Sequence, residues 1–121
     1  MAIVIIVDDS LLSRSLVRRL LEERGHSVIE AVDGNDGLEK IVSTPVIDLV
    51  ITDYNMPGCD GLTMLSNAKK QRQQWSFPIF LITTESTVGF IKNARDLGVT
   101  LWIRKPVNEA MLIAGIVKVL G

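Results

Sequence analysis

The feature that most constrains the fold is a regular alternation of short apolar runs and longer amphipathic stretches along the chain. The runs are four to six residues long and rich in Val, Ile and Leu. The central runs are apolar at successive positions, which is typical of strands buried on both faces of a sheet. We therefore expect strands over residues 3–7, 27–31, 48–52, 78–83 and 100–103.

The stretches between these runs have the spacing of helices. Leu12, Leu16 and Leu20 recur at every fourth position after the first run, where they predict an inward face, and Gly25 follows as a stop signal. Pro45 closes the next stretch. We expect helices over about residues 10–24, 35–43, 60–74, 86–97 and 107–120.

Five alternations of strand and helix predict an α/β fold. We expect a doubly wound, five-stranded parallel sheet with right-handed crossovers and helices on both faces. With 121 residues, of which 47% are hydrophobic, and with no linker, we expect a single domain over residues 1–121. Because ligands bind such sheets at the carboxyl ends of the strands, the residues that follow each strand decide the function.

The composition argues against several classes of function. The formal net charge is −1 and no run of Lys and Arg occurs, so we expect no direct contact with nucleic acid. The first apolar run is too short for a signal-peptide core and acids follow it directly, so we expect a cytoplasmic protein without membrane insertion. The single Cys59 can form no internal disulfide and is interpreted as an incidental loop residue.

Polar residues follow four of the five predicted strands. Asp8 and Asp9 follow the first strand, Asp53 the third, Thr83 the fourth and Lys105 the fifth. Three carboxylates at one point of the sheet repel each other unless a cation lies among them, and oxygen ligands suit Mg²⁺ or Mn²⁺. A metal on one side and a hydroxyl and an ammonium on the other form a clamp for a phosphoryl group, with Asp53 as the candidate nucleophile.

Four segments, in this order and spacing, carry a resemblance to a known family: "VDDS", "DLVITDYNMPGCDG", "ITTE" and "IRKP". With them the whole chain resembles the receiver domain of two-component response regulators. This resemblance implies a flavodoxin-like, CheY-like topology, with five helices and a five-stranded sheet in the strand order 2-1-3-4-5. Because the chain ends after its fifth helix, it is most similar to stand-alone receivers of the chemotaxis type.

The resemblance also implies roles for individual residues. Asp53 would be the phosphoacceptor, while Asp9, Asp53 and the backbone carbonyl of Asn55 would hold Mg²⁺, with Asp8 assisting through water. Mn²⁺ would be able to substitute for Mg²⁺. In this interpretation the chain catalyses only its own phosphorylation and dephosphorylation and is not an enzyme that turns over a separate substrate.

Three further positions complete the implied site. Lys105 and Thr83 would bind the phosphoryl oxygens. Trp102 occupies the place of a switch aromatic, which is usually Tyr or Phe in the family. The implied partners are a histidine kinase or phosphotransfer protein as donor and a downstream protein. That protein would bind the fourth helix, fifth strand and fifth helix, or the outer face of the fifth helix, which would alternatively form a homodimer.

Two details of the sequence extend this interpretation. Asn55 and Glu85 lie two residues past Asp53 and Thr83, and neither is a bulky apolar side chain, so we expect water to reach the phosphoryl group and the phosphorylated state to be short-lived. The fifth helix is unusually apolar. We therefore expect Ile113 and Val117 to be partly exposed within a contact surface.

Three alternatives remain open. Hydrolases of the haloacid-dehalogenase type also use an aspartate nucleophile with Mg²⁺, but they need a second acid where this chain has Asn55. A flavodoxin-like binding module needs a phosphate loop where Asp8 and Asp9 would repel the phosphate. The third alternative is a receiver-like interaction module that is never phosphorylated, and failure to label with acetyl phosphate would support it.

Overall fold

The computed structural model of the chain describes residues 1–84 and 88–121, with side chains described outside residues 85–90. Strands and helices alternate strictly along this part of the chain, as the apolar pattern predicts, and they lie within a few residues of the expected bounds. The elements are β1 (Ile3–Val7), α1 (Leu11–Glu22), β2 (Ser27–Ala31), α2 (Gly34–Ser43), β3 (Leu49–Asp53), α3 (Gly61–Gln71), β4 (Ile79–Thr83), α4 (Val88–Asp96), β5 (Val99–Arg104) and α5 (Glu109–Leu120).

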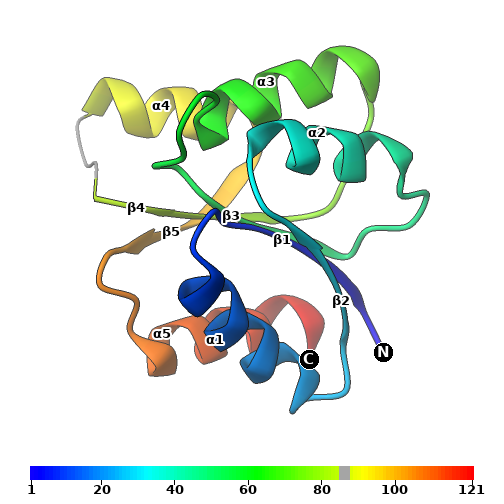
Figure 1. Ribbon diagram of the computed structural model, residues 1–121, viewed down its shortest axis with the longest axis vertical. Helices are drawn as coiled ribbons and strands as arrows, with labels where there is room; N and C mark the ends of the chain where they lie inside the picture. Colours follow the sequence, from blue (N-terminus) through cyan, green and yellow to red (C-terminus); the bar gives the residue numbers. More distant parts are fainter. Residues whose placement is uncertain (85–87) are drawn as a thin grey trace.

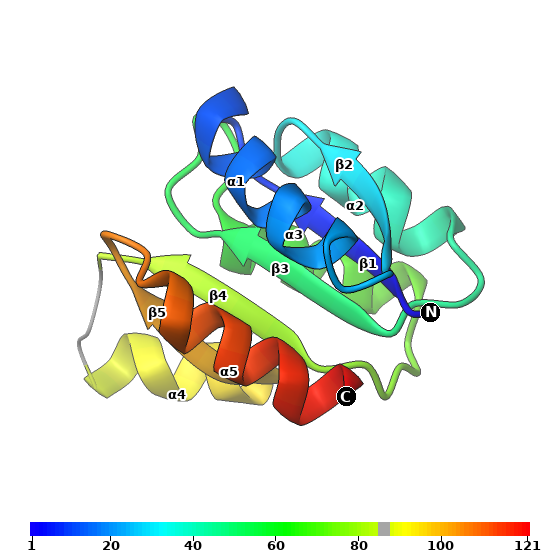
Figure 2. The same cartoon turned by 90° about the horizontal axis from the view of Figure 1, so that it is seen from below.

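The strands form one sheet in the order β2-β1-β3-β4-β5, and every neighbouring pair is parallel. The expected α/β fold and strand order are therefore confirmed. Helices α2, α3 and α4 cover one face of the sheet, and α1 and α5 cover the other (Figures 1 and 2). Because all strands run in the same direction, their carboxyl ends lie along one edge, where the order reverses between β1 and β3.

Successive residues of the strands supply two separate cores. On β1, Ile5 and Val7 face the cluster that includes α2 and α3, whereas Val4 and Ile6 face the cluster that includes α1 and α5. This alternation buries both faces of β1, which explains why its sequence is apolar at successive positions. No helix in the described residues is long and apolar enough to cross a membrane.

The face of α1 that contacts the sheet differs from the expected one. Val17, Leu20 and Leu21 are buried, but Leu12 is 84% exposed, so its expected inward position is wrong. A helix turns by about 100° per residue, so each four-residue step drifts about 40° past a full turn. Two such steps carry Leu12 away from the line of Leu20, and the first turn of α1 leaves it in solvent.

Helix α3 ends earlier than expected, at Gln71 rather than near residue 74. The backbone of Arg72 leaves the helical region there, with φ −126° and ψ 83°. Its guanidinium donates hydrogen bonds to the carbonyl of Ile41, in the last turn of α2, and to the carbonyls of Thr44 and Pro45, which come just after that helix. These bonds satisfy carbonyls that α2 leaves without helical partners, and they join the ends of the two helices.

The outer face of α5 is partly exposed, as expected. Val117 is 47% exposed, and Ile113 is half-buried against the core that includes α1. Met111 adds a further exposed apolar side chain on the same helix. The contact surface expected here stays a prediction.

Gly61 allows α3 to begin directly against the end of β3. A Cβ atom at this position would lie 2.5 Å from the backbone oxygen of Asp53, too close for any real contact. We expect Gly61→Ala to lower the free energy of unfolding by about 3 kcal/mol, because the backbone must shift. Urea denaturation measures this change.

The matched control is Gly25→Ala. Gly25 has φ +83° and open space where a Cβ would lie, so this variant carries only the strain of the left-handed conformation, about 1 kcal/mol. Equal losses of stability in the two variants would show that the close approach of α3 to Asp53 has no energetic weight.

Candidate functional site

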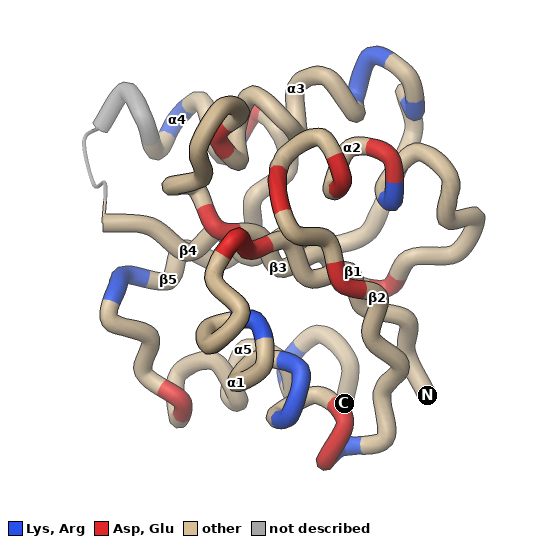
Figure 3. The backbone as a smooth tube through the Cα atoms, viewed as in Figure 1, with Lys and Arg blue, Asp and Glu red and all other residues tan. Residues whose placement is uncertain are grey.

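Three carboxylates meet at the carboxyl edge of the sheet. Asp8 and Asp9 directly follow β1, and Asp53 is the last residue of the adjacent strand β3. One carboxylate oxygen from each residue lies within 4.8 Å of the others, so the structure brings together the three acids that the sequence singled out. Figure 3 shows the acidic segments at the ends of β1 and β3 side by side.

Backbone groups fix two of these carboxylates. The Ser10 N–H donates to Oδ1 of Asp8 at 2.8 Å, within the turn that leads into α1. The Asn55 N–H donates to Oδ1 of Asp53 at 3.1 Å, within the loop that follows β3. Each acid is therefore oriented by the residue two positions after it, a local pattern common for Asp in turns.

Without a bound cation, burial of these carboxylates and the repulsion between them lower the stability of the fold. Asp8 and Asp53 are 5% and 4% exposed, whereas Asp9 is exposed. Burial raises the pKa of Asp8 above its ordinary value, and the negative charges of Asp53 and Asp9 act in the same direction, against the hydrogen bond from Ser10. Three carboxylate ligands that together carry more negative charge than the one nearby lysine can balance suit a hard divalent cation, so these residues fit Mg²⁺ or Mn²⁺.

Lys105 lies on the other side of Asp53. Its Nζ atom is 2.9 Å from Oδ1 and 3.0 Å from Oδ2 of the Asp53 carboxylate, so the two form a close ion pair. The Lys105 backbone N–H donates to the carbonyl of Thr83 at 3.1 Å, which fixes the start of the loop after β5 to the end of β4. The structure therefore places Lys105, which follows β5, beside Asp53, and its expected role in binding phosphoryl oxygens stays a prediction.

The remaining expected residues lie near this centre or behind it. Thr83 ends β4 and is fully buried at the same edge of the sheet. Asn55 is exposed in the loop after β3. Trp102 lies opposite Leu81 of β4 and is half-buried against the core that includes α3 and α4. Glu85 lies outside the described residues.

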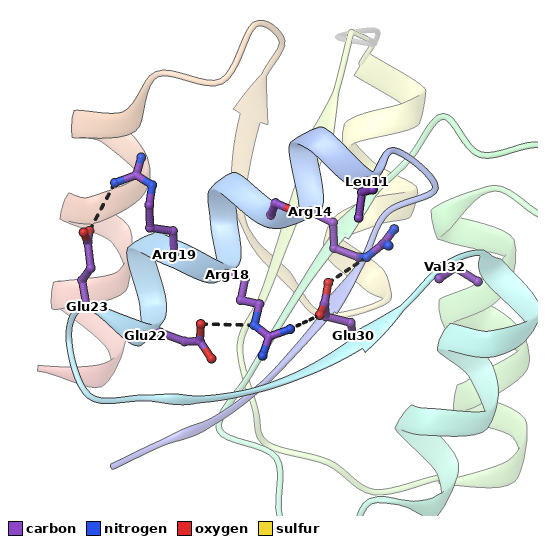
Figure 4. A pocket seen from close by; sticks show the side chains of 9 residues that line it. Leu11, Arg14, Arg18, Arg19, Glu22, Glu23, Glu30 and Val32 are labelled. Atoms are coloured by element: carbon purple, nitrogen blue, oxygen red, sulfur yellow. Dashed lines mark hydrogen bonds and ion pairs between the residues drawn. The ribbon is translucent and has the colours of Figure 1, made fainter.

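A further pair of residues contacts the site, and the sequence interpretation missed it. Nη1 of Arg14 donates to the backbone oxygen of Asp8 at 2.8 Å, and Nε of Arg14 donates to Oε1 of Glu30 at 2.9 Å. Glu30 lies on β2, so this strand also supports the edge of the sheet, through its contact with Arg14. The sequence signal that could have indicated this contact is the four-residue spacing of Arg14 and Arg18, which places both on one side of α1. In the structure both arginines pair with Glu30 (Figure 4).

The sequence profile of a family described as "Response regulator receiver domain" matches residues 4–117 of the chain. The chain belongs to this family.

Individual relatives of this receiver domain agree with the assignment. A protein named "Chemotaxis protein CheY homolog" from Campylobacter jejuni is 30% identical over 118 residues, which are 97% of this chain and 91% of the relative. The structure of Vibrio cholerae chemotaxis protein CheY4 has a TM-score of 0.87 at 33% identity and covers 99% of both chains.

A CheY-like receiver domain protein from Methanospirillum hungatei is also similar in structure. It has a TM-score of 0.85 at 25% identity and covers 98% of this chain and 92% of its own. The chain is thus a receiver domain of the CheY type, a signalling switch of the two-component kind. This assignment leaves the hydrolase and the flavodoxin-like binding module without support.

Proposed function

We propose that this receiver domain accepts a phosphoryl group on Asp53, in a Mg²⁺-dependent reaction, from a histidine kinase or a phosphotransfer protein. One observation carries the proposal. The buried Asp53 carboxylate has an acidic pair within 4.8 Å on one side and the Lys105 ammonium within 3.0 Å on the other. A carboxylate held between a cation site and a fixed ammonium is arranged to receive a phosphoryl group and stabilise its charge.

The reaction is a transfer between two nucleophiles. An Asp53 oxygen attacks the phosphorus atom of a phosphohistidine, the P–N bond breaks, and the imidazole leaves with the electron pair and takes up a proton. The product on this chain is an acyl phosphate. Asn55 orients the Asp53 carboxylate through its backbone N–H at 3.1 Å, which limits the rotation of the nucleophile before attack.

The divalent cation would be held by Asp8, Asp9, Asp53 and the backbone carbonyl of Asn55. When bound, it supplies positive charge between the carboxylates and the incoming phosphoryl oxygens. Asp9 is the exposed carboxylate of the set and thus the acid that first meets a cation from solvent, whereas Asp8 is buried. Asp8 and Asp9 need only supply negative charge that holds the cation, and neither acts as an acid or a base.

Lys105 and Thr83 would receive the phosphoryl oxygens. The Lys105 ammonium already pairs with both oxygens of Asp53, so on phosphorylation it exchanges this contact for one with the phosphoryl group. Thr83 would contribute its hydroxyl from the end of β4. Trp102 lies on β5 three residues before Lys105, and we propose that its ring transmits the change to the surface of α4 and β5.

The phosphorylated chain would change partners and would act as a single domain in the cytoplasm. The surface of α4, β5 and α5, or the outer face of α5 alone, would contact the downstream protein or a second copy of the chain. The exposed Met111 and Val117 on α5 favour this face, because apolar side chains in solvent mark contact surfaces when they gather on one helix.

Acetyl phosphate tests the proposal without a kinase. With Mg²⁺, we expect the intact mass of the purified protein to rise by one phosphoryl group, and borohydride reduction to place the acyl phosphate at position 53 as homoserine. Removal of Mg²⁺ by a chelator should abolish this increase in mass. An unlabelled wild-type protein that still captures a partner would instead favour the interaction module that is never phosphorylated.

A further inference from the structure

Arg14 is a buried cation in an unfavourable place. It lies in the first turn of α1, where the positive end of the helix dipole opposes another positive charge, and it is only 9% exposed. Burial of an unpaired guanidinium costs several kcal/mol, so such a residue persists only when its donors are well paired. The two bonds that Arg14 makes show what it is paired with.

The guanidinium joins two elements at the metal site. Nη1 donates to the backbone oxygen of Asp8 at 2.8 Å in a buried contact, and Nε donates to the Glu30 carboxylate on β2 at 2.9 Å. Figure 4 shows Arg14 between α1 and β2, with Arg18 bound to the other oxygen of Glu30. Glu30 neutralises Arg14 and also fixes the direction of its planar group.

The peptide group between Asp8 and Asp9 affects the orientation of both residues. The peptide bond is planar, so the oxygen of Asp8 and the nitrogen of Asp9 move as one unit. The Asp8 N–H donates to Ala31 of β2 at 3.1 Å, and the Ser10 N–H binds the Asp8 side chain. Arg14 provides the third constraint on this turn and the only one, within the described hydrogen bonds, that acts on the Asp8–Asp9 peptide oxygen.

The geometry points to Arg14 as a positioning residue of the cation site, which holds the carboxylates of Asp8 and Asp9 in place through the peptide that joins them. This role rests on the proposed function of the site. A purely electrostatic role of Arg14 would change the affinity for the cation in the opposite direction. Removal of a positive charge near three carboxylates strengthens their attraction for a cation, whereas loss of the hydrogen bond to Asp8 weakens binding because the ligands must be ordered again.

Two variants separate these effects. Arg14→Met removes the charge and the hydrogen bonds, and Arg14→Lys keeps the charge but loses the planar fork. We expect both to weaken Mg²⁺ binding by about tenfold, measured by isothermal titration calorimetry, as is typical when support for metal ligands is removed. Arg18→Met is the matched control, because Arg18 also pairs with Glu30 but is exposed and makes no described contact with Asp8.

Amide hydrogen exchange provides a second measurement that needs no metal. In the metal-free Arg14 variants, we expect faster exchange of the Asp8 and Ser10 amides and unchanged exchange of the Tyr54 amide, which bonds to Ile82 at 2.8 Å. A merely structural role would instead speed exchange at all three amides. If Arg14→Met does not fold, Arg14→Lys decides with the same measurements.

Two results would overturn the inference: Mg²⁺ binding by a folded Arg14 variant as tight as that of the wild type, or unchanged exchange at Asp8 and Ser10. If the wild type itself binds no Mg²⁺, the proposed function fails. The exchange measurement then decides alone whether Arg14 positions the turn.

Discussion

Replacement of Asp53 by Asn should abolish labelling by acetyl phosphate and leave the fold intact. The amide has the same shape as the carboxylate and keeps an oxygen that accepts the Asn55 N–H, so the loop after β3 is held as before. It cannot attack phosphorus at a useful rate, because its oxygen carries no full negative charge. The loss of one charge from a cluster of three also removes repulsion, which offsets the lost ion pair with Lys105.

Asp60→Asn is the matched control for this experiment. Asp60 lies in the same loop and caps α3 by accepting the Thr63 N–H at 2.8 Å, a role that Asn fills equally well. Intact mass with and without Mg²⁺ and thermal melting check both variants. Undiminished labelling of Asp53→Asn would place the nucleophile at another residue and would contradict the proposed function.

The positions of the candidate site residues could be predicted because these residues lie at the ends of the strands. Once an apolar run is identified as a parallel strand, the residue after it must lie at the carboxyl edge, so no long-range contact is needed to place Asp8, Asp53 or Lys105. The order of the strands came from the family resemblance. Propensity and spacing alone do not determine which strands are neighbours, because many crossovers have similar lengths.

The contacts that were missed depend on side chains that meet across elements. Arg14 reaches Asp8 and Glu30 because α1 packs at one particular angle on β1 and β2, and no periodicity in the sequence encodes that angle. Helix α3 ends at Gln71, where Arg72 finds carbonyl partners at the end of α2 and just after it, 27 to 31 residues earlier in the chain. Such pairings arise from tertiary packing, which overrides local helix preference at the ends of elements.

Mg²⁺ should stabilise the fold by about 2.7 kcal/mol when it is present at 100 times its dissociation constant. The stabilisation arises because the folded chain gathers three carboxylates within 4.8 Å, whereas the unfolded chain holds Asp53 far from Asp8 and Asp9. Urea denaturation with and without Mg²⁺ measures the difference. The comparison must be made at constant ionic strength, because salt alone screens repulsion between charges.

Two substitutions in the cluster should have different effects. Asp9→Ala removes the exposed ligand, so we expect little change in the metal-free protein and loss of most of the response to Mg²⁺. Asp8→Asn removes a buried charge but keeps an oxygen that accepts the Ser10 N–H, so the metal-free protein should gain about 1 kcal/mol. Its response to Mg²⁺ should also fall.

The sign of the Asp8 effect follows from its pKa. Burial raises the pKa of this carboxyl, so the folded chain holds the proton more tightly than the unfolded chain does. The charged form therefore destabilises the metal-free fold at neutral pH, and this penalty disappears as the pH falls through the raised pKa toward the ordinary value. Asn carries no such penalty at any pH. Two results together would contradict the cation site: a metal-free Asp8→Asn protein less stable than the wild type at neutral pH, and a wild type whose stability does not change with Mg²⁺. They would show that burial and repulsion of the three carboxylates do not destabilise the fold and that these carboxylates do not bind a cation.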